Sequence, residues 1–332
     1  AHLLAFGLAA AGQCTATFTG VGMLPGRTSS SGQAVSGDGT AVVGYSSSTA
    51  GTHAFRWTHS GGIEDLLAPN GGDAWAYGVS GDGSVVAGKG LMQNTWGGRW
   101  TSATGWSILR VGGSGQAFGT SVSTDGSTIA GDWYICCCSN YHSFINLNPN
   151  QSSVWLENSG GFGCFNCDTT VRAVSGNGAF AVGSMGYGDC QAYSACNVVR
   201  WNRSGVKELL GDPGGTGATL SSGWNSYATG VNQDGSVLAA TSRYALSPDR
   251  YRAYKWTQAT PTQPATWRSL GDLGGGDSRS ASVNADGTVF VGKSIKATGE
   301  THAFLIRPGL AMTDLNTYLP ALGVSNLEGW IL

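Results

Sequence analysis

The chain has 332 residues, of which 11% are charged, and its formal net charge at pH 7 is −2. Because nucleic-acid binding needs a basic surface, this balance gives no reason to expect a nucleic-acid partner, and no continuous apolar stretch is long enough for membrane insertion. The 54 Gly and 12 Trp residues, with so few charges, are typical of an all-β protein with tight turns.

Residues 1–13 are apolar and contain a run of three alanines near their end. This pattern is typical of a secretory signal peptide with its cleavage site. Cys14 would suit a lipoprotein, but Gln13 stands where a lipobox has Gly or Ala, which favours simple export. A buried first strand is the alternative, although residues 3–11 do not alternate with a period of two. We expect a signal-peptide remnant over residues 1–13 and one repeat domain over residues 14–332, in a secreted or cell-surface protein.

One short motif occurs six times along the chain. It consists of a valine, two small or polar residues, Asp or Asn, and a glycine, and an apolar run follows it. The copies begin at Val35, Val79, Val122, Val174, Val231 and Val283. A repeat at intervals of roughly 40 to 60 residues is typical of a solenoid, a propeller or an array.

The first unit shows how one repeat is built. Residues 33–36 form a short extended run, and Gly37-Asp38-Gly39 favours a tight hairpin turn into a second strand over residues 41–44. Residues 53–58 alternate apolar and polar side chains as a third strand, and residues 63–66 follow a Ser-Gly-Gly turn as a fourth. We therefore predict a β-propeller of four-stranded antiparallel blades. A β-solenoid is the alternative, but its rungs are usually shorter.

The third strand carries the residues that suggest a family. The repeat resembles the extracellular HAF repeat of secreted bacterial proteins, because His53-Ala54-Phe55 and His302-Ala303-Phe304 match its tripeptide. His142-Ser143-Phe144 and Arg252-Ala253-Tyr254 are degenerate versions, and the second and fourth units lack it. The resemblance covers residues 16–332 approximately. It implies an extracytoplasmic location and a propeller-like fold, and it transfers no catalytic residues.

Strand order separates two faces of such a propeller. The first–second and third–fourth turns share one side, here called the turn face, and the longer loops and the links between units share the other, the connection face. We assign seven aromatic residues to these connections as candidate binding residues: Trp75, Tyr77, Trp96, Trp133, Tyr134, Trp224 and Tyr227. Such rings suit stacking on sugars or anchoring a protein, whereas packing between blades is the alternative for each of them. The prediction is a recognition or structural module whose partner is a glycan or a cell-surface protein.

Seven cysteines fall in loops on the connection face of two neighbouring units: Cys136, Cys137, Cys138, Cys164, Cys167, Cys190 and Cys196. In an exported chain we expect disulfides. A metal site that also uses His142 is the alternative. Each Asp-Gly turn offers one carboxylate only, so the turns do not suit calcium. We predict no metal and no cofactor.

Catalysis is the alternative hypothesis for the function of the connection face. Five carboxylates are placed there by the predicted strand order: Asp73, Asp132, Asp168, Asp189 and Asp277. Paired carboxylates could serve a glycoside hydrolase or lyase. No catalytic motif is present, however, and we favour a protein that binds without catalysis.

The number of fourth strands leaves ring closure open. Residues 18–24 and residues 310–315 both resemble a fourth strand, which makes seven fourth strands for six complete repeats. The tail, residues 329–332, resembles the start of a further first strand. One account is a seven-bladed ring that lacks the middle strands of its last blade. The other is a six-bladed ring in which residues 18–24 pair with the third strand of the sixth unit, near Phe304.

Overall fold

The computed structural model describes residues 19–68, 71–91, 95–109, 111, 116–135, 140–147, 153–156, 169–186, 196–213, 226–246, 249–328 and 332. Within these ranges the strands form six four-stranded antiparallel sheets, here called blades 1 to 6, and the strand order in each sheet follows the chain.

The strand bounds for the first three blades are β1 (Ser29–Val35), β2 (Ala41–Ser48), β3 (Gly51–Thr58) and β4 (Gly62–Asp65); β5 (Ala74–Val79), β6 (Val85–Leu91), β7 (Thr95–Thr101) and β8 (Gly105–Ile108); β9 (Gln116–Val122), β10 (Ile129–Ile135), β11 (Asn140–Asn146) and β12 (Val154–Trp155). Those for the last three are β13 (Thr169–Val174), β14 (Phe180–Gly186), β15 (Cys196–Asn202) and β16 (Lys207–Gly211); β17 (Ser226–Val231), β18 (Val237–Leu246), β19 (Asp249–Thr257) and β20 (Thr266–Ser269); β21 (Gly274–Val283), β22 (Phe290–Lys296), β23 (Thr301–Arg307) and β24 (Leu310–Asp314). One helix, α1 (Leu315–Ala321), follows β24.

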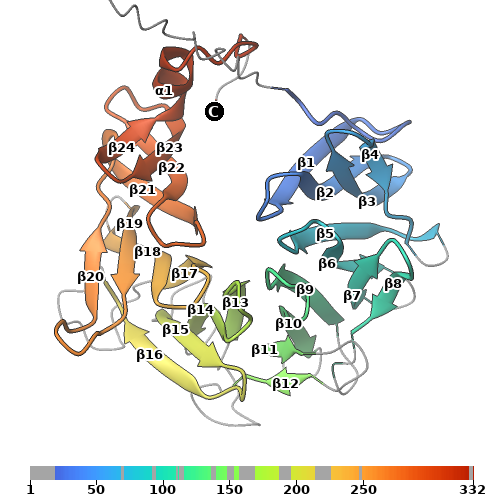
Figure 1. The fold of residues 1–332 in the computed structure, drawn as a ribbon, viewed down its shortest axis with the longest axis horizontal. Coiled ribbons are helices and arrows are strands. Elements are labelled where there is room, and N and C mark those ends of the chain that lie inside the picture. Colours follow the sequence, from blue (N-terminus) through green and yellow to red (C-terminus); the bar gives the residue numbers. More distant parts are fainter. Residues whose placement is uncertain are drawn as a thin grey trace, which may run out of the picture.

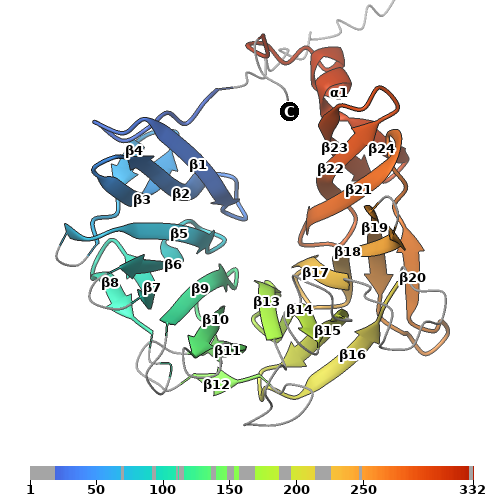
Figure 2. The same cartoon turned by 180° about the vertical axis from the view of Figure 1, so that it is seen from behind.

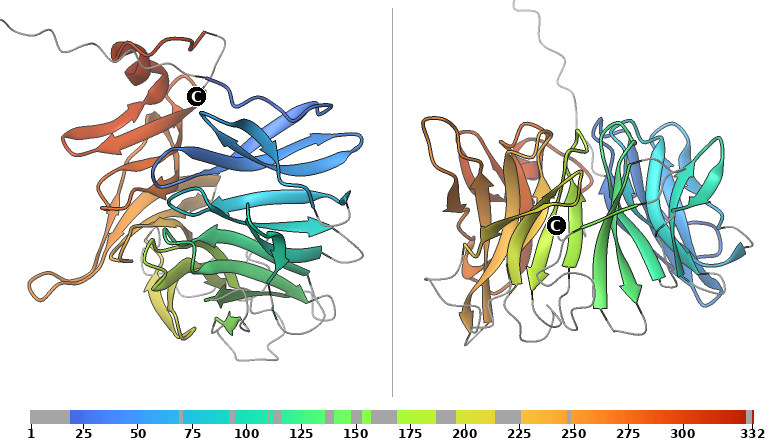
Figure 3. Two further views of the ribbon diagram at one scale, coloured as in Figure 1. Left: turned by 45° about the vertical axis from the view of Figure 1, so that its right-hand side comes forward. Right: turned by 90° about the horizontal axis from the view of Figure 1, so that it is seen from below.

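The blades stand side by side around a central axis, and in each blade the first strand lies innermost and the fourth outermost (Figure 1). Seen from the side, the sheets form one layer about as deep as a strand is long (Figure 3). The fold is therefore a β-propeller, as the repeat predicted. In blade 1, β1 and β3 begin two to four residues before the predicted strands, β2 ends four residues later, and β4 is shifted by one residue.

Each motif forms a hairpin turn that its own polar side chains close. In blade 1, Asp38 Oδ1 accepts hydrogen bonds from Ser36 Oγ at 2.6 Å and from the Thr40 amide at 2.9 Å. Gly39 has φ +72°, a conformation that disfavours residues with a side chain. The Asp side chain and the Gly backbone are both used by the turn itself, which explains why the motif recurs.

Backbone hydrogen bonds join consecutive turns around the turn face. An amide of one turn donates to a carbonyl of the next. The donor–acceptor pairs are Asp38–Gly81, Gly81–Thr124, Thr124–Gly176, Asn177–Gln233 and Gln233–Ala285, with N···O distances of 2.8 to 3.0 Å. The resulting ladder runs from blade 1 to blade 6 and ties the inner ends of the sheets together.

Apolar side chains fill each junction between consecutive blades. Five buried clusters occur, one for each junction from blades 1 and 2 to blades 5 and 6. The junction of blades 3 and 4, for example, buries Ile145, Val171 and Trp201. A fully buried side chain of this size contributes about 1.5–3 kcal/mol, so the blades are held to each other mainly by these faces.

The His-Ala-Phe tripeptide has a packing role at its three positions. His53 Nδ1 lies 2.7 Å from Asp65 Oδ2 on the neighbouring strand, while Ala54 and Phe55 are fully buried. The Phe55 ring covers Gly44 of β2, where a Cβ atom would lie 2.9 Å from the ring. The tripeptide therefore couples the third strand to the fourth strand, to the next blade and to the second strand.

The ring is open between blades 6 and 1 (Figures 1 and 2). The edge of β23 that residues 18–24 were alternatively predicted to occupy is paired with β24, through Phe304–Asp314 and Leu305–Thr313. The six-bladed closure is therefore wrong, because the fourth strand of the last blade comes from the chain that directly follows its third strand. Residues 19–28, instead, lie against blade 1, where Leu24 is buried and its amide donates to Ser46 Oγ.

Candidate functional site

The six innermost strands surround a central channel. It encloses a cavity of about 570 Å³ whose described lining comes from β1, β5, β9, β13, β17 and β21, with Val42 of β2. The cavity volume lies within the range of small-molecule binding pockets. Of the lining residues that the structure describes, Arg172 alone carries a charged side chain.

Every inner strand has a β-bulge at the same place, two residues before the motif valine. In blade 2, Ala76 pairs with Gly88 and Gly78 with Ala87, so Tyr77 is the extra residue. The bulge residues of the six blades are Gln33, Tyr77, Thr120, Arg172, Thr229 and Ala281. All six line the cavity. A bulge redirects a side chain that regular pairing would place elsewhere, and here it presents one side chain per blade to the channel.

These six residues, here called the bulge ring, differ in chemistry although their backbone setting repeats. The residue after each bulge is always small: Ala34, Gly78, Ser121, Ala173, Gly230 and Ser282. At Gly78, for instance, a Cβ would lie 2.9 Å from the Cα of Ser121 in the next blade. The wall is therefore close-packed backbone, and the bulge ring determines which polar groups a ligand in the channel would meet.

Aromatic residues and cations lie beside the ring. The Lys89 ammonium is 4.9 Å from the centre of the Trp75 ring, 5.7 Å from Tyr77 and 5.1 Å from Phe118. Burial lowers the pKa of Lys89. Burial, with a smaller effect of Tyr45, raises the pKa of Tyr77 to about 12. The Tyr77 phenol therefore stays protonated at neutral pH and can donate a hydrogen bond.

A second cation–aromatic pair lies across the channel wall. The Arg172 guanidinium is 5.2 Å from the centre of the Tyr227 ring, on the next inner strand. Arg172 is exposed, and its guanidinium has no hydrogen-bond acceptor among the described residues. It combines an aromatic platform with free N–H donors, an arrangement that suits a carboxylate or another acidic group.

The six described aromatic residues of the predicted set lie in strands and not in connections, because the strands reach further toward the connection face than the hairpins alone indicated. Trp75 and Tyr77 lie on β5, and Tyr227 on β17. Two others, Trp96 and Trp133, are buried in T-shaped or tilted contact with Trp106 and Trp155 respectively, at ring-centre distances of 5.5 and 4.7 Å. Burial removes Trp96 and Trp133 from a binding surface.

The two remaining aromatic residues of the predicted set are Tyr134 and Trp224. Tyr134 lies on β10 and is partly exposed. Trp224 lies outside the described residues. Four polar residues of the bulge ring were not predicted from the sequence: Gln33, Thr120, Arg172 and Thr229. An alignment of the repeats would have found all four, since each stands two residues before a motif valine.

The described carboxylates of the predicted set bind backbone amides. Asp73 accepts from the Thr52 amide at 2.8 Å, and Asp277 occupies the equivalent position in blade 6 and accepts from the Tyr251 amide at 2.9 Å. Asp132 is buried between blades 3 and 4. These three positions hold adjacent blades together and form no facing pair. Asp168 and Asp189 lie outside the described residues.

Asp132 has the most perturbed carboxyl of this set. Burial raises its pKa to about 6, against the opposing effect of hydrogen bonds from Ser143 Oγ at 2.6 Å and the Val171 amide at 2.8 Å. Both donors contact Oδ1. A buried carboxyl that is bonded to its own framework is a structural group here, because it is not part of the channel lining.

The cysteine prediction falls almost wholly outside the described residues. Cys196 begins β15, and only its backbone is described. Cys136, Cys137, Cys138, Cys164, Cys167 and Cys190 lie outside. In the part of the chain that the structure describes, three metal-binding side chains nowhere gather into one group, and no helix there has the length and apolar character to span a membrane.

No protein-family model and no curated protein matches this sequence. Solved structures do match its fold. An oligogalacturonate lyase from Vibrio parahaemolyticus superposes with a TM-score of 0.56 and 12% identity, over 85% of this chain and 76% of that chain. A structure described under two prolyl endopeptidases matches with a TM-score of 0.52 and 13% identity, over 83% of this chain and 41% of that one.

The putative TolB of Agrobacterium tumefaciens is a further match, with a TM-score of 0.47 and 12% identity, over 79% of this chain and 82% of that chain. The lyase is a β-propeller, in agreement with the six sheets described above. At these identities the likeness establishes the fold alone, so the site has to be interpreted from its own residues.

Proposed function

We propose that this protein is a secreted or cell-surface β-propeller of the HAF-repeat type that acts as a recognition module and binds carbohydrate in its central channel. The observation that carries the proposal is the bulge ring. One residue per blade departs from regular pairing and lines the cavity, and these residues differ while the surrounding backbone repeats. Such variation on a constant scaffold is typical of binding sites.

The chemistry of the ring suits a sugar. Tyr77 supplies a phenol, Gln33 an amide, and Thr120 and Thr229 supply hydroxyls. The Thr120 hydroxyl donates to the Ala130 carbonyl at 3.1 Å, which fixes its orientation and leaves its oxygen free to accept. Carbohydrates present many hydroxyl donors and acceptors, so they match a ring of neutral polar groups.

Arg172 narrows the ligand to an acidic oligosaccharide. It is the charged residue of the described lining, its donors have no acceptor among the described residues, and its guanidinium lies over the Tyr227 ring. A charge-assisted hydrogen bond is about twice as strong as a neutral one. A uronate or sulfated sugar therefore gains more from this channel than a neutral sugar of the same size.

The export part of the proposal is supported by the apolar segment over residues 1–13 and by the His-Ala-Phe repeats. Its test is fractionation of cells that express the gene with its own amino-terminal segment. The protein should be found outside the cytoplasm, and a wholly cytoplasmic protein would contradict it.

A glycan array that contains neutral, uronate and sulfated oligosaccharides tests the ligand class. Titration of the best ligand should then show that Arg172→Ala weakens binding by roughly 10- to 100-fold, the effect of one charge-assisted hydrogen bond of about 1.5–3 kcal/mol. The matched control is Arg268→Ala, because Arg268 is an exposed arginine on the outermost strand β20. An equal loss in both variants would contradict the proposed site.

Two other results would replace the proposal. Release of reducing ends from a polysaccharide would indicate the alternative, a glycoside hydrolase or lyase. Binding of a cell-surface protein in the absence of any glycan signal would indicate a protein partner. Three of the predicted catalytic carboxylates support neither a hydrolase nor a lyase, because each accepts a hydrogen bond from a backbone amide: Asp73, Asp132 and Asp277.

A further inference from the structure

The face of blade 6 that borders the gap exposes residues whose equivalents in the other blades are buried. Val291 of β22 is 36% exposed, whereas its equivalents in blades 1 to 5 are completely buried: Val43, Ala87, Ala130, Val182 and Ala239. Leu305 of β23 is partly exposed, whereas its equivalent Ile145 is buried against blade 4. The side chains are still apolar, so the face retains the composition of an inter-blade junction.

The opposite face, on blade 1, has the same property. Val35 is 61% exposed, whereas its equivalent Val283 is buried. Val42 and Trp57 are partly exposed. Their equivalents in blade 2 are Val86 on β6 and Trp100 on β7, and both are buried against blade 1. Blade 1 thus presents a face built to receive a preceding blade.

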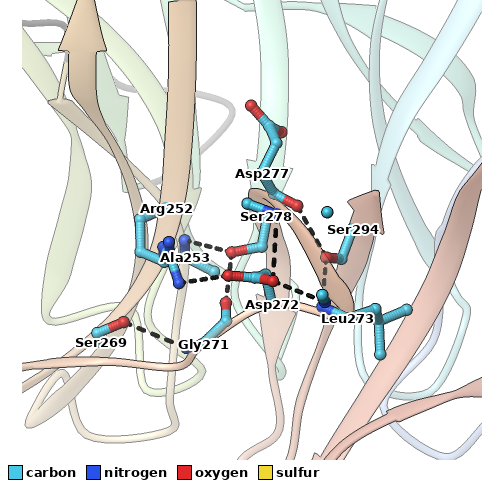
Figure 4. Close-up of polar contacts among 12 residues, drawn as sticks. Arg252, Ala253, Ser269, Gly271, Asp272, Leu273, Asp277, Ser278 and Ser294 are labelled. Carbon is cyan, nitrogen blue, oxygen red and sulfur yellow. Dashed lines mark hydrogen bonds and ion pairs between the residues drawn. The ribbon is translucent and has the colours of Figure 1, made fainter. Parts of the chain in front are cut away.

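The closed junction of blades 5 and 6 shows what such a contact needs (Figure 4). The Ala253 amide of β19 donates at 3.0 Å to Oγ of Ser278, a residue of the next inner strand β21. The Leu273 amide donates to Ser294 Oγ at 3.0 Å, and Ser294 Oγ donates to the Asp277 carbonyl at 2.8 Å. The first contact joins a third strand to the next blade. The second holds the link between two blades against the second strand of the next blade.

Related contacts occur at the open junction, one on each side, although a main-chain carbonyl replaces the serine hydroxyl in the first of them. The Ala303 amide of β23, equivalent to Ala253, donates to the Leu332 carbonyl at 2.7 Å. The Leu24 amide donates to Ser46 Oγ at 3.2 Å, and Ser46 Oγ donates to the Ser29 carbonyl at 2.9 Å. Leu332 therefore supplies an acceptor to the third strand, as Ser278 does at the closed junction, and Leu24 lies where a link from a previous fourth strand would arrive.

The ladder of turns ends at the same two blades. Ala285 accepts from Gln233, but its own amide has no backbone acceptor among the described residues. At the other end, the Gly37 carbonyl accepts from no described turn. Each of the five closed junctions has a donor and an acceptor at this level, so one donor and one acceptor at the ends of the ladder have no backbone partner among the described residues.

We propose that the gap between blades 6 and 1 is a docking surface for one more sheet of this repeat. The sheet contributes three antiparallel strands: its inner strand follows Leu332, and its third strand pairs with residues 19–21 as the fourth. One side of it is apolar toward Val291 and Leu305, and the other toward Val42 and Trp57. Burying these faces removes the exposed sheet surfaces that an open ring leaves.

The test adds such a sheet to the full chain. Residues 279–307, which include β22 and β23, are copied after Leu332, so that the copied segment begins where Arg279 follows Ser278. The thermal unfolding midpoint should rise by about 5 °C or more, since burying several apolar side chains adds a few kcal/mol. Hydrogen exchange at the amides of Val42 and Val291 should slow.

The matched control is the same extension with Phe290→Ser and Val291→Ser in the copied segment only, which should give neither effect. An unmodified extension that leaves the midpoint and the exchange unchanged would overturn the proposal. So would a stable dimer of the original chain that protects Val35 and Val291, because a second copy would then fill the gap. The circular dichroism spectrum of the unmodified extension, compared with that of the original chain, shows whether its six blades still fold, so that a negative result does not come from a failure to fold.

Discussion

His53 Nδ1 lies 2.7 Å from Asp65 Oδ2, and His302 and Asp314 repeat this pair at 2.7 Å in the last blade. In both blades the histidine belongs to the third strand and the aspartate to the fourth. Arg252 of blade 5, which stands in place of the histidine, lies 2.6 Å from Asp272. The first residue of the tripeptide is thus a partner for an acidic residue, which lies on the fourth strand in blades 1 and 6 and in the link that follows it in blade 5.

The His53–Asp65 pair should show measurable coupling in a double-mutant cycle with His53→Ala and Asp65→Ala. We expect about 0.5–1.5 kcal/mol, because both side chains are mostly buried and the contact is short. The matched control is Arg56–Glu64 on the same two strands, at 3.7 Å with Glu64 half exposed, which should couple by less than about 0.5 kcal/mol. Equal coupling in both cycles would show that the His–Asp geometry adds nothing.

Gly44→Ala should destabilise the protein by about 1–3 kcal/mol. A Cβ at Gly44 would overlap the Ser31 carbonyl oxygen and lie 2.9 Å from the Phe55 ring, and neither can move without disturbing blade 1. Gly32→Ala in the neighbouring strand is the control, since its nearest atom is Val42 Cγ1 at 3.5 Å. Urea unfolding of both variants measures the difference, and a neutral effect of Gly44→Ala would contradict the bulge geometry.

Acid should weaken the turns. Hydrogen bonds from Ser80 Oγ, the Ser84 amide and Ser84 Oγ lower the pKa of Asp82 to about 2. The equivalent groups shifted in the same direction are Asp38, Asp125, Asp234 and Asp286. The folded protein holds these carboxylates ionised more firmly than the unfolded chain, so their contribution is present above about pH 4 and is lost as pH falls toward 2.

Asn177 in blade 4 provides a natural model for the test, because its Oδ1 accepts the same kind of bonds from Ser175 Oγ and the Ala179 amide. Asp82→Asn should therefore fold, and its thermal midpoint should fall less steeply between pH 4 and pH 2 than that of the wild type. An unchanged slope would mean that Asp82 does not titrate in this window.

Asp132 should have the opposite pH dependence. Its pKa is raised to about 6 by burial, so the folded state binds this proton more tightly than the unfolded chain, and the corresponding stability is lost as pH rises from about 4 through 6. Asp132→Asn keeps an acceptor for Ser143 and Val171 without the buried charge. It should stabilise the protein by about 1–3 kcal/mol at pH 8 and have little effect at pH 4, as measured by chemical denaturation at both values.

Asp132→Ala is the contrasting variant. It leaves the Val171 amide without its acceptor, which should cost about 1–3 kcal/mol at both pH values. A destabilised Asp132→Asn protein at pH 8 would show that the ionised carboxylate is the form the fold requires.

The repeat was sufficient to predict four-stranded blades, because its information is local. Each Asp-Gly turn needs a positive φ at its glycine and bonds within five residues, as Ser36, Asp38 and Gly39 show, and strand alternation depends on neighbours along the chain. The role of Asp38 and its equivalents as turn residues was predictable for the same reason.

The candidate site and the open ring were decided by tertiary structure. Whether Arg172 faces the channel depends on a bulge between β13 and β14, which shifts side chains by one residue and arises from pairing, not from local preference. Trp96 and Trp133 were predicted to bind and are buried, because exposure depends on the neighbouring blade. The edge of β23 pairs with β24 and not with residues 18–24. Composition makes both segments equally suitable, but only the short connection from β23 lets β24 reach that edge at little entropic cost.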